Sequence, residues 1–187
     1  MEMMKVSLDC VHEVFEEQAA RTPDATAVVF EGRGTPYGEL NARANRLARH
    51  LTALGVRRGD TVGVLLERDT ELVVAVLAVL KAGAGYTLLD PALPAARVRE
   101  IASLAGAAHA VTTARLAGRW DGTPVLPVPV DAEADAVAAR DAGKRCGCSA
   151  RRCRGTPSRW SCSGRCCTAA PASSSPGRAR SRPSSPN

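Results

Sequence analysis

The sequence has no uninterrupted run of about eighteen apolar residues, the length that a membrane-spanning helix needs. Its N-terminus, MEMMKVSLDCVHEVFEEQ, also lacks the basic segment followed by an apolar segment that is typical of a signal peptide. These two absences predict a chain that does not enter a membrane and that resides in the cytoplasm. Cysteines stay reduced in the cytoplasm, so we do not expect a disulfide framework.

Acidic residues are missing from the last quarter of the chain. No Asp or Glu occurs from Ala142 to Asn187, whereas Lys144 and nine arginines do, in a chain whose formal net charge is +6. The first 141 residues therefore carry a net charge of about −4. Branched aliphatic residues also stop after Val137. Such a segment cannot bury enough apolar surface to offset the entropy lost on ordering. We expect an incomplete domain over residues 1–140, whose partial sheet should make the chain poorly soluble or molten, and a disordered Arg/Cys/Ser/Pro-rich tail over 141–187.

The tail also lacks the spacing of a structural zinc site. Such sites use paired Cys-x-x-Cys or Cys/His ligands, and this tail contains no His. A zinc site is therefore a weak hypothesis. Six of the seven cysteines of the chain lie here, at Cys146, Cys148, Cys153, Cys162, Cys166 and Cys167.

Candidate catalytic groups are sparse in the first part of the chain. The three histidines are far apart in sequence, so we predict surface or capping roles for them, and Cys10 is predicted to be a packed or idle thiol. Three glutamates near the N-terminus are predicted to lie on a solvated helix face. These residues are His12, His50 and His109, and Glu13, Glu16 and Glu17.

Hydrophobic periodicity predicts helices that alternate with strands. A helix over about 11–20, capped by Asp9, would place four apolar residues on one face, namely Val11, Val14, Phe15 and Ala19. ATAVVFEG predicts a strand, with RGTPYGEL as its hairpin partner or a loop. The clearest helix spans 39–54 and stops at Gly55.

The next segments continue this alternation. DTVGVLLE predicts a buried strand, and ELVVAVLAVLKAG fits either a helix or a strand. Its length, a cap at Asp69 or Thr70 and the stop at Gly83 favour a buried helix. YTLLD and HAVTT predict strands on either side of a helix that Pro94 opens and that runs to Leu104, and TPVLPVPVD predicts an edge strand. The fold class that follows is α/β, with a mainly parallel sheet.

Four stretches resemble the start of an adenylation domain of nonribosomal peptide synthetases, in the superfamily of adenylate-forming enzymes. VHEVFEEQAARTPDATAVVFEG is similar to the opening helix and strand of the family, and LKAGAGYTLLDP resembles its second core motif. TPYGELNARANRLARHLTALGVRRGDTVGVLLER is similar to its first core motif, and PAARVREIASLAGAAHAVTT follows in the expected order. The likeness covers roughly residues 11–113 and implies a partial N-terminal subdomain of the adenylate-forming fold.

The resemblance also implies a reaction for the complete parent domain. Such domains activate an amino acid with ATP and Mg²⁺ and pass it to a carrier protein that works beside condensation domains. Their phosphate loop, amino-acid pocket and catalytic lysine match nothing in this sequence. Gly83, Gly85 and Asp90 would be scaffold residues that turn the chain. We therefore expect no catalytic, cofactor-binding or metal-ligating residue here, no cofactor on this chain, and an inactive, truncated domain.

The basic tail can be interpreted with the genetic code. In a GC-rich gene, Trp160 to Ser163 permit Val-Met-Phe in a shifted frame, and Thr168 to Ala170 permit Gly-Arg-Pro. The family has similar residues around its phosphate loop, so we predict a change of frame near Arg140. Two alternatives stay open: a subunit of a split adenylation enzyme, and a non-enzymatic protein whose tail binds nucleic acid or zinc. Nucleic acid is the less favoured partner, because no recognisable nucleic-acid module accompanies the arginines.

Overall fold

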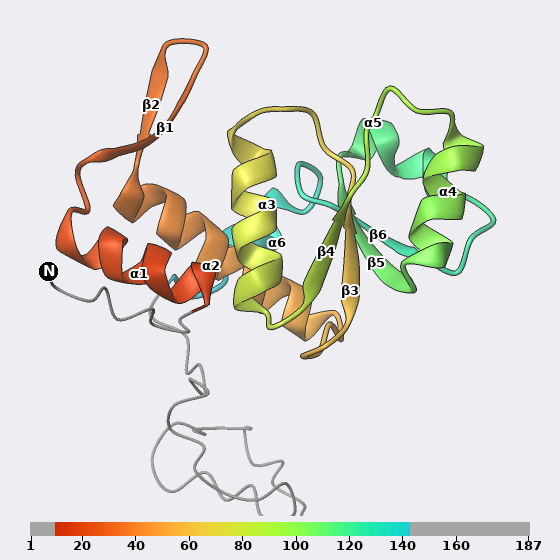
Figure 1. The fold of residues 1–187 in the computed structure, drawn as a ribbon, viewed down its shortest axis with the longest axis horizontal. Helices are drawn as coiled ribbons and strands as arrows, with labels where there is room; N and C mark the ends of the chain where they lie inside the picture. The colour runs from red at the N-terminus through yellow and green to blue at the C-terminus, as the bar shows by residue number, and fades with distance from the viewer. Residues whose placement is uncertain (1–9, 143–187) are drawn as a thin grey trace, which may run out of the picture. The chain divides into compact units, whose positions relative to one another are not determined.

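The computed structural model describes residues 10–142 (Figure 1). The predicted disorder of the tail falls outside these residues, apart from its first two positions. The predicted cap of the first helix at Asp9 is wrong, because the helix begins at Val11 and its N-cap residue is Cys10. No helix in the described part of the chain is long and apolar enough to cross a membrane. The elements are α1 Val11–Arg21, β1 Thr26–Phe30, β2 Arg33–Pro36, α2 Tyr37–Ala53, β3 Thr61–Val64, α3 Thr70–Lys81, β4 Gly85–Leu88, α4 Ala95–Leu104, β5 Ala107–Thr112, α5 Ala114–Ala117, the 3-10 turn η1 Gly118–Trp120, β6 Leu126–Pro129 and α6 Ala134–Ala138.

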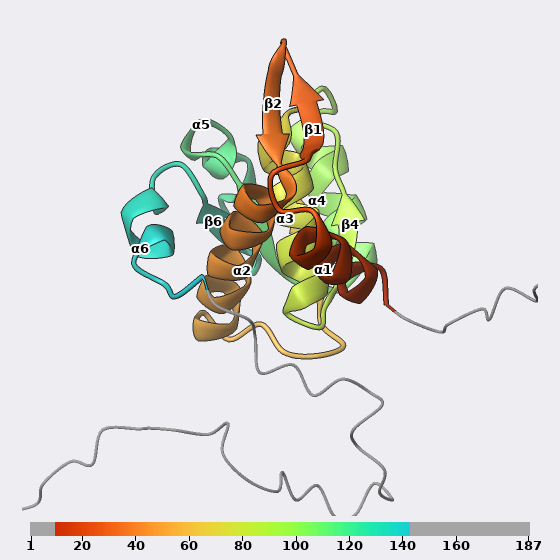
Figure 2. The same cartoon turned by 90° about the vertical axis from the view of Figure 1, so that its left-hand side faces the viewer.

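Strands β1 and β2 form an antiparallel hairpin, in which Phe30 pairs with Arg33. The two residues between them, Glu31 and Gly32, both have positive φ, at 47° and 77°. This is the backbone twist that a two-residue hairpin turn requires. Figure 2 shows the hairpin projecting beyond helices α1 and α2. The hairpin partner predicted for residues 33–40 is confirmed for 33–36 only, because residues 37–40 already belong to helix α2, Tyr37–Ala53.

Strands β3 to β6 form a parallel sheet in the order β4-β3-β5-β6. The chain goes from β3 through α3 to β4 on one side, and then crosses back through α4 to β5 on the other side. Right-handed crossovers in opposite directions must lie on opposite faces of a sheet. Helices α3 and α4 accordingly lie on the two faces, as Figure 1 shows. The α/β class and the parallel sheet are confirmed.

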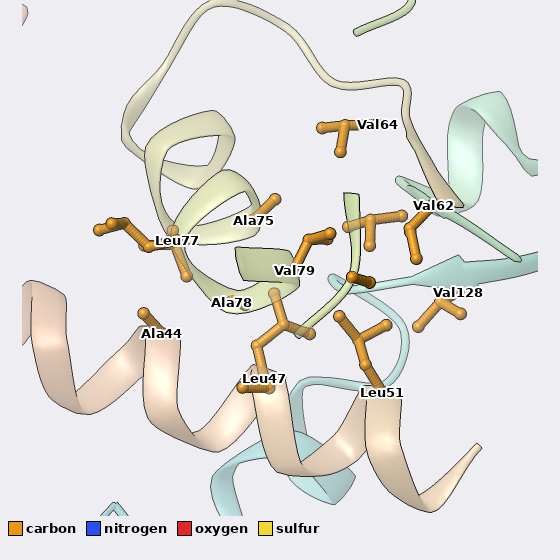
Figure 3. Close-up of a cluster of buried hydrophobic side chains, with 14 of the residues drawn as sticks. Ala44, Leu47, Leu51, Val62, Val64, Ala75, Leu77, Ala78, Val79 and Val128 are labelled. Atoms are coloured by element: carbon orange, nitrogen blue, oxygen red, sulfur yellow. The ribbon is translucent and has the colours of Figure 1, made fainter. Parts of the chain in front are cut away.

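Each face of the sheet has its own hydrophobic core. On the α2/α3 face, Leu47 and Leu51 of α2 pack with Val79 of α3 against Val62 of β3 (Figure 3). On the α4 face, Val98 and Trp120 lie in a second cluster that contains Ala110 of β5 and Leu65, which directly follows β3. Side chains alternate along each strand, so one sheet supplies both cores.

Helix α1 differs from its prediction. Phe15 and Ala19 pack inward, but Val11 and Val14 are 71% and 53% exposed, so only part of the predicted apolar face is buried. The polar Glu16 lies beyond Ala19 around the helix, on the side away from Val14, and binds Lys81 of α3. Because α1 contacts α2 and α3 along a narrow stripe that includes this ion pair, its other apolar residues stay in solvent.

Candidate functional site

The carboxyl ends of β3, β4, β5 and β6 lie at one edge of the sheet, because the strands are parallel. After β3 the chain moves toward β4, and after β5 it moves the opposite way, toward β6. The point where these directions diverge, between β3 and β5, is where open α/β sheets bind ligands. We therefore take this edge as the candidate functional site.

An ion pair spans the divergence point. Arg115, which follows β5, donates from Nη2 to Oε1 of Glu67, which follows β3, over 2.6 Å. The two side chains are 69% and 56% exposed. Water screens such a pair, so it joins the two loops without contributing much stability.

A depression of about 770 Å³ lies beside this pair, between the ends of β3 and β4. Two carboxylates in its lining accept hydrogen bonds from backbone amides. Asp69 caps α3 by accepting from the Leu72 amide at 3.1 Å, and Asp90 accepts from the Ala92 amide at 2.8 Å. The cap at Asp69 and the turn at Asp90 were predicted from the sequence, and both are confirmed. The lining residues are Leu66, Glu67, Arg68, Asp69, Leu72, Leu88, Leu89, Asp90 and Pro91.

Two threonines at the end of β5 carry hydroxyl groups that are buried without a hydrogen-bond partner in the described part of the chain. They are Thr112, which is fully buried, and Thr113. Beside them, Asp131 accepts from the amides of Ala114, at 2.7 Å, and Ala132, at 3.0 Å. These hydroxyls were not predicted from the sequence, although HAVTT shows two polar residues at the end of an apolar strand.

The donor set at this edge does not by itself fit the ATP and Mg²⁺ that the resemblance implies. A nucleotide site needs backbone amides and cations for the phosphates, and free carboxylates for the metal ion. Here Asp69 and Asp90 accept from backbone amides, and Glu67 is paired with Arg115. Within residues 10–142, no group of three His, Cys, Asp or Glu side chains could hold a metal ion. These residues by themselves therefore support no chemical step with ATP.

The structure places two of the predicted surface residues differently. His50 is only 4% exposed, and its Nε2 lies 2.5 Å from Oε2 of Glu133, so its predicted surface or capping role is wrong. His50 lies on a polar face of α2. It is buried because the segment around α6 covers that face. Glu16 is also not on a solvated face, because it pairs with the buried Lys81.

The remaining predicted residues stay apart from the candidate site. His12 and Cys10 lie at the start of α1, where the exposed Cys10 donates its amide to Glu13 at 3.3 Å. His109 at the start of β5 lies 3.3 Å from the carbonyl of Leu54. The structure therefore does not bring the three histidines together. The six tail cysteines lie outside the described residues.

Comparison with known proteins identifies relatives. The AMP-binding enzyme family matches residues 15–158, which extends past residue 140. Over 92 residues the chain is 59% identical to surfactin synthase subunit 2 of Bacillus subtilis (strain 168), covering 49% of the chain and 3% of that protein. Over 131 residues it is 46% identical to phosphinothricin tripeptide synthetase PhsC of Streptomyces viridochromogenes, covering 70% of the chain and 12% of that protein.

Solved structures have the same fold. The nonribosomal peptide synthetase FmoA3, bound to alpha-methyl-L-serine-AMP, superimposes with a TM-score of 0.60 at 40% identity, over 64% of this chain and 14% of FmoA3. The N-terminal subdomain of Klebsiella oxytoca NpsA, in complex with 3-hydroxyanthranilyl-AMSN, gives a TM-score of 0.67 at 26% identity, over 77% and 36%. The chain thus spans only a small part of these relatives. It belongs to the AMP-binding enzyme family, and its fold is that of part of the N-terminal subdomain of a nonribosomal peptide synthetase adenylation domain.

Proposed function

We propose that this chain supplies scaffold to an adenylation domain that activates an amino acid with ATP and Mg²⁺ and passes it to a carrier protein. The observation that carries the proposal is the agreement in order and fold with synthetases, of which the chain spans between 1% and 12%. One solved relative is an artificially fused adenylation-PCP di-domain, which supports a carrier protein as the partner class. We also propose that the parent enzyme works with condensation domains and that it resides in the cytoplasm.

The scaffold role follows from what the described carboxylates do. Asp69 and Asp90 hold α3 and the turn after β4 in place, and Glu67 joins that edge to Arg115. These interactions shape the carboxyl edge of the sheet and leave the charge stabilisation of an adenylate to other residues. We therefore propose that the chain alone does not catalyse adenylation.

Amino-acid-dependent exchange of pyrophosphate into ATP tests this proposal. We expect no exchange by the purified chain with any of the proteinogenic amino acids. Exchange by the chain alone would overturn the scaffold role. A split enzyme is tested in the same assay, by adding a second polypeptide that carries the later motifs of the family. Exchange only in the mixture would establish the chain as a complementing subunit.

The domain boundary near residue 140 and the origin of the tail are part of the proposal. The family match ends at residue 158, so it includes residues on both sides of that boundary. Translating the coding DNA past residue 140 in the other two frames tests the change of frame. We expect the strand and phosphate loop of the family in one of them. Stoichiometric zinc, or nucleic-acid binding that disappears when residues 142–187 are deleted, would instead support a binding tail.

A further inference from the structure

Strand β4 forms one end of the parallel sheet. Its only strand neighbour among the described residues is β3. The strand sequence, GYTL, contains no charge and no proline. Natural edge strands are commonly protected from pairing by a lysine, a proline, a bulge or a covering element. The sequence of β4 therefore contains neither a lysine nor a proline that would protect this edge from pairing.

The backbone groups of β4 divide between the two sides of the strand. The amide of Gly85 donates to Asp60 at 2.8 Å, and that of Leu89 donates to Val64 at 2.9 Å, so odd-numbered residues face β3. Backbone groups alternate in direction along a strand. The N–H and C=O groups of Tyr86 and Leu88 therefore point outward, away from the sheet.

The side chains of the same two residues are apolar and partly exposed. Tyr86 is 42% exposed and Leu88 is 55% exposed. They pair in register with Val62 and Val64 of β3, so they lie on the face that α2 and α3 cover. The helices bury the two valines fully and leave the β4 side chains partly in solvent.

We propose that β4 pairs antiparallel with β4 of a second copy of this chain, with Thr87 on the two-fold axis. In this register Tyr86 stands opposite Leu88 of the second copy, and Leu88 stands opposite Tyr86. All four residues direct their backbone groups at the partner strand, so the pairing forms four hydrogen bonds and two cross-strand apolar pairs. A register shifted by two residues would use Ala84, whose amide already donates to Val79 at 3.1 Å.

Charge complementarity supports the antiparallel orientation. Exposed Arg58 packs beside Gly83 at the amino end of β4, because a Cβ on Gly83 would lie 3.4 Å from the Cβ of Arg58. Exposed Asp90 follows the carboxyl end. The antiparallel register places Ala84 opposite Asp90 of the second copy. Arg58 lies on the β3 side of β4, where Gly59 donates to Gly83, so its long side chain must extend across the end of β4 to approach Asp90. Such exposed pairs add little affinity but oppose the wrong register.

Sedimentation of the full chain tests the proposal. We expect a reversible monomer–dimer equilibrium over roughly 1–200 µM in reducing buffer, as for a small interface. Leu88→Lys should weaken the dimer at least about tenfold, because it places a charge at the paired edge. Leu104→Lys is the matched control, since Leu104 on α4 is 80% exposed, and it should leave the equilibrium unchanged. A chain that stays monomeric at every concentration overturns the proposal, and so does equal weakening by both variants.

Cross-linking tests the register and does not depend on how soluble the variants are. Thr87→Cys places two thiols across the two-fold axis, at the spacing of a disulfide. After oxidation, peptide mapping by mass spectrometry should detect a disulfide between the two copies at position 87, which is distinguishable from links made by the native cysteines. Gly85→Cys is the control, because a Cβ at Gly85 meets only the Asp60 carbonyl, at 3.8 Å. In this register the two thiols introduced at position 85 are roughly 13 Å apart along the strands and should not link. Links at position 85 and not at 87 would overturn the register.

Swapping the two charges tests the orientation. Arg58→Asp and Asp90→Arg alone should each weaken the dimer, because each places like charges together. The double variant restores opposite charges and should recover most of the loss. Additive weakening in the double variant would contradict the antiparallel arrangement. A second polypeptide that displaces the dimer and protects β4 from hydrogen exchange would instead assign this edge to a complementing subunit.

Discussion

The Nε2 atom of His50 lies 2.5 Å from Oε2 of Glu133, which joins helix α2 to the segment that contains α6. Two other α2 residues hold the same segment: Asn45 donates to the carbonyl of Ala142 at 3.0 Å, and Arg49 pairs with Asp141 at 2.9 Å. Three polar side chains on one helix therefore hold residues 133–142 against the α2/α3 core.

Removing the carboxylate of Glu133 should loosen this segment. Glu133→Ala leaves the buried His50 with neither ring nitrogen bonded to the protein, because Nδ1 already lacks a partner among the described residues. We expect a loss of about 1–3 kcal/mol in the free energy of unfolding. Amide hydrogen exchange should also become faster over residues 134–138.

Glu100→Ala is the matched control for Glu133→Ala. Glu100 pairs with Arg97 at 2.8 Å, but both side chains are 56% exposed. We expect its effect to stay within about 0.5 kcal/mol. Equal effects of the two substitutions, or unchanged exchange over residues 134–138 in Glu133→Ala, would contradict the role of the His50 contact.

Substitutions around the buried ammonium of Lys81 should differ in how much they lower the free energy of unfolding. Lys81 is fully buried, pairs with Glu16 and donates to Oδ1 of Asn41 at 2.7 Å. Glu16→Gln leaves a buried cation without its carboxylate and should cost about 3–5 kcal/mol. The double variant Glu16→Gln with Lys81→Met removes the cation and should be more stable than Glu16→Gln alone. Chemical denaturation measures both, and additive losses would contradict the pairing.

The pair between Glu67 and Arg115 should contribute little stability because it is exposed. Glu67→Ala should change the free energy of unfolding by no more than about 0.5 kcal/mol at physiological salt. The difference from the unsubstituted chain should shrink further at about 1 M salt. A large, salt-independent loss would show that Glu67 supports the sheet edge in another way.

Glycine at position 83 should be required for the end of α3. Gly83 has φ of +82°, its amide donates to Leu80 at 3.0 Å, and the Ala84 amide donates to Val79 at 3.1 Å. This is the Schellman arrangement, in which a left-handed glycine closes a helix. Gly83→Ala should cost about 1 kcal/mol in thermal or chemical denaturation.

Gly85→Ala is the control for Gly83→Ala, because Gly85 lies in β4 and does not have positive φ. Its new Cβ would meet only one atom, at 3.8 Å, so the substitution should be neutral within about 0.5 kcal/mol. A greater loss at Gly85 than at Gly83 would contradict the backbone argument.

Much of the fold could be predicted because its signals are local. The apolar stripe of α2 and the stop at Gly55 predicted 39–54, and the helix spans Tyr37–Ala53. The cap at Asp69 and the stop at Gly83 identified α3 as a helix in spite of its β-branched residues. The alternation of helices and strands predicted the parallel sheet, because parallel strands need long crossover connections.

The candidate site was harder to predict. Asp69 and Asp90 were identified because capping and turns act within a few residues. The Glu67–Arg115 pair and the buried hydroxyls of Thr112 and Thr113 depend on which strands are neighbours. That order, β4-β3-β5-β6, is not encoded in any local pattern.

The sequence by itself determined the class of this protein, the order of its elements and the ends of its main helices, because periodicity, caps and glycines act over one or two turns. Only the tertiary structure decided which polar residues became internal. His50, Glu16 and Lys81 have ordinary surface residue types, yet His50 and Lys81 are buried and Glu16 pairs with Lys81, because α6 and α1 cover the polar sides of α2 and α3. It also decided that Tyr86 and Leu88 stay partly exposed, since β4 has a neighbour on one side only among the described residues.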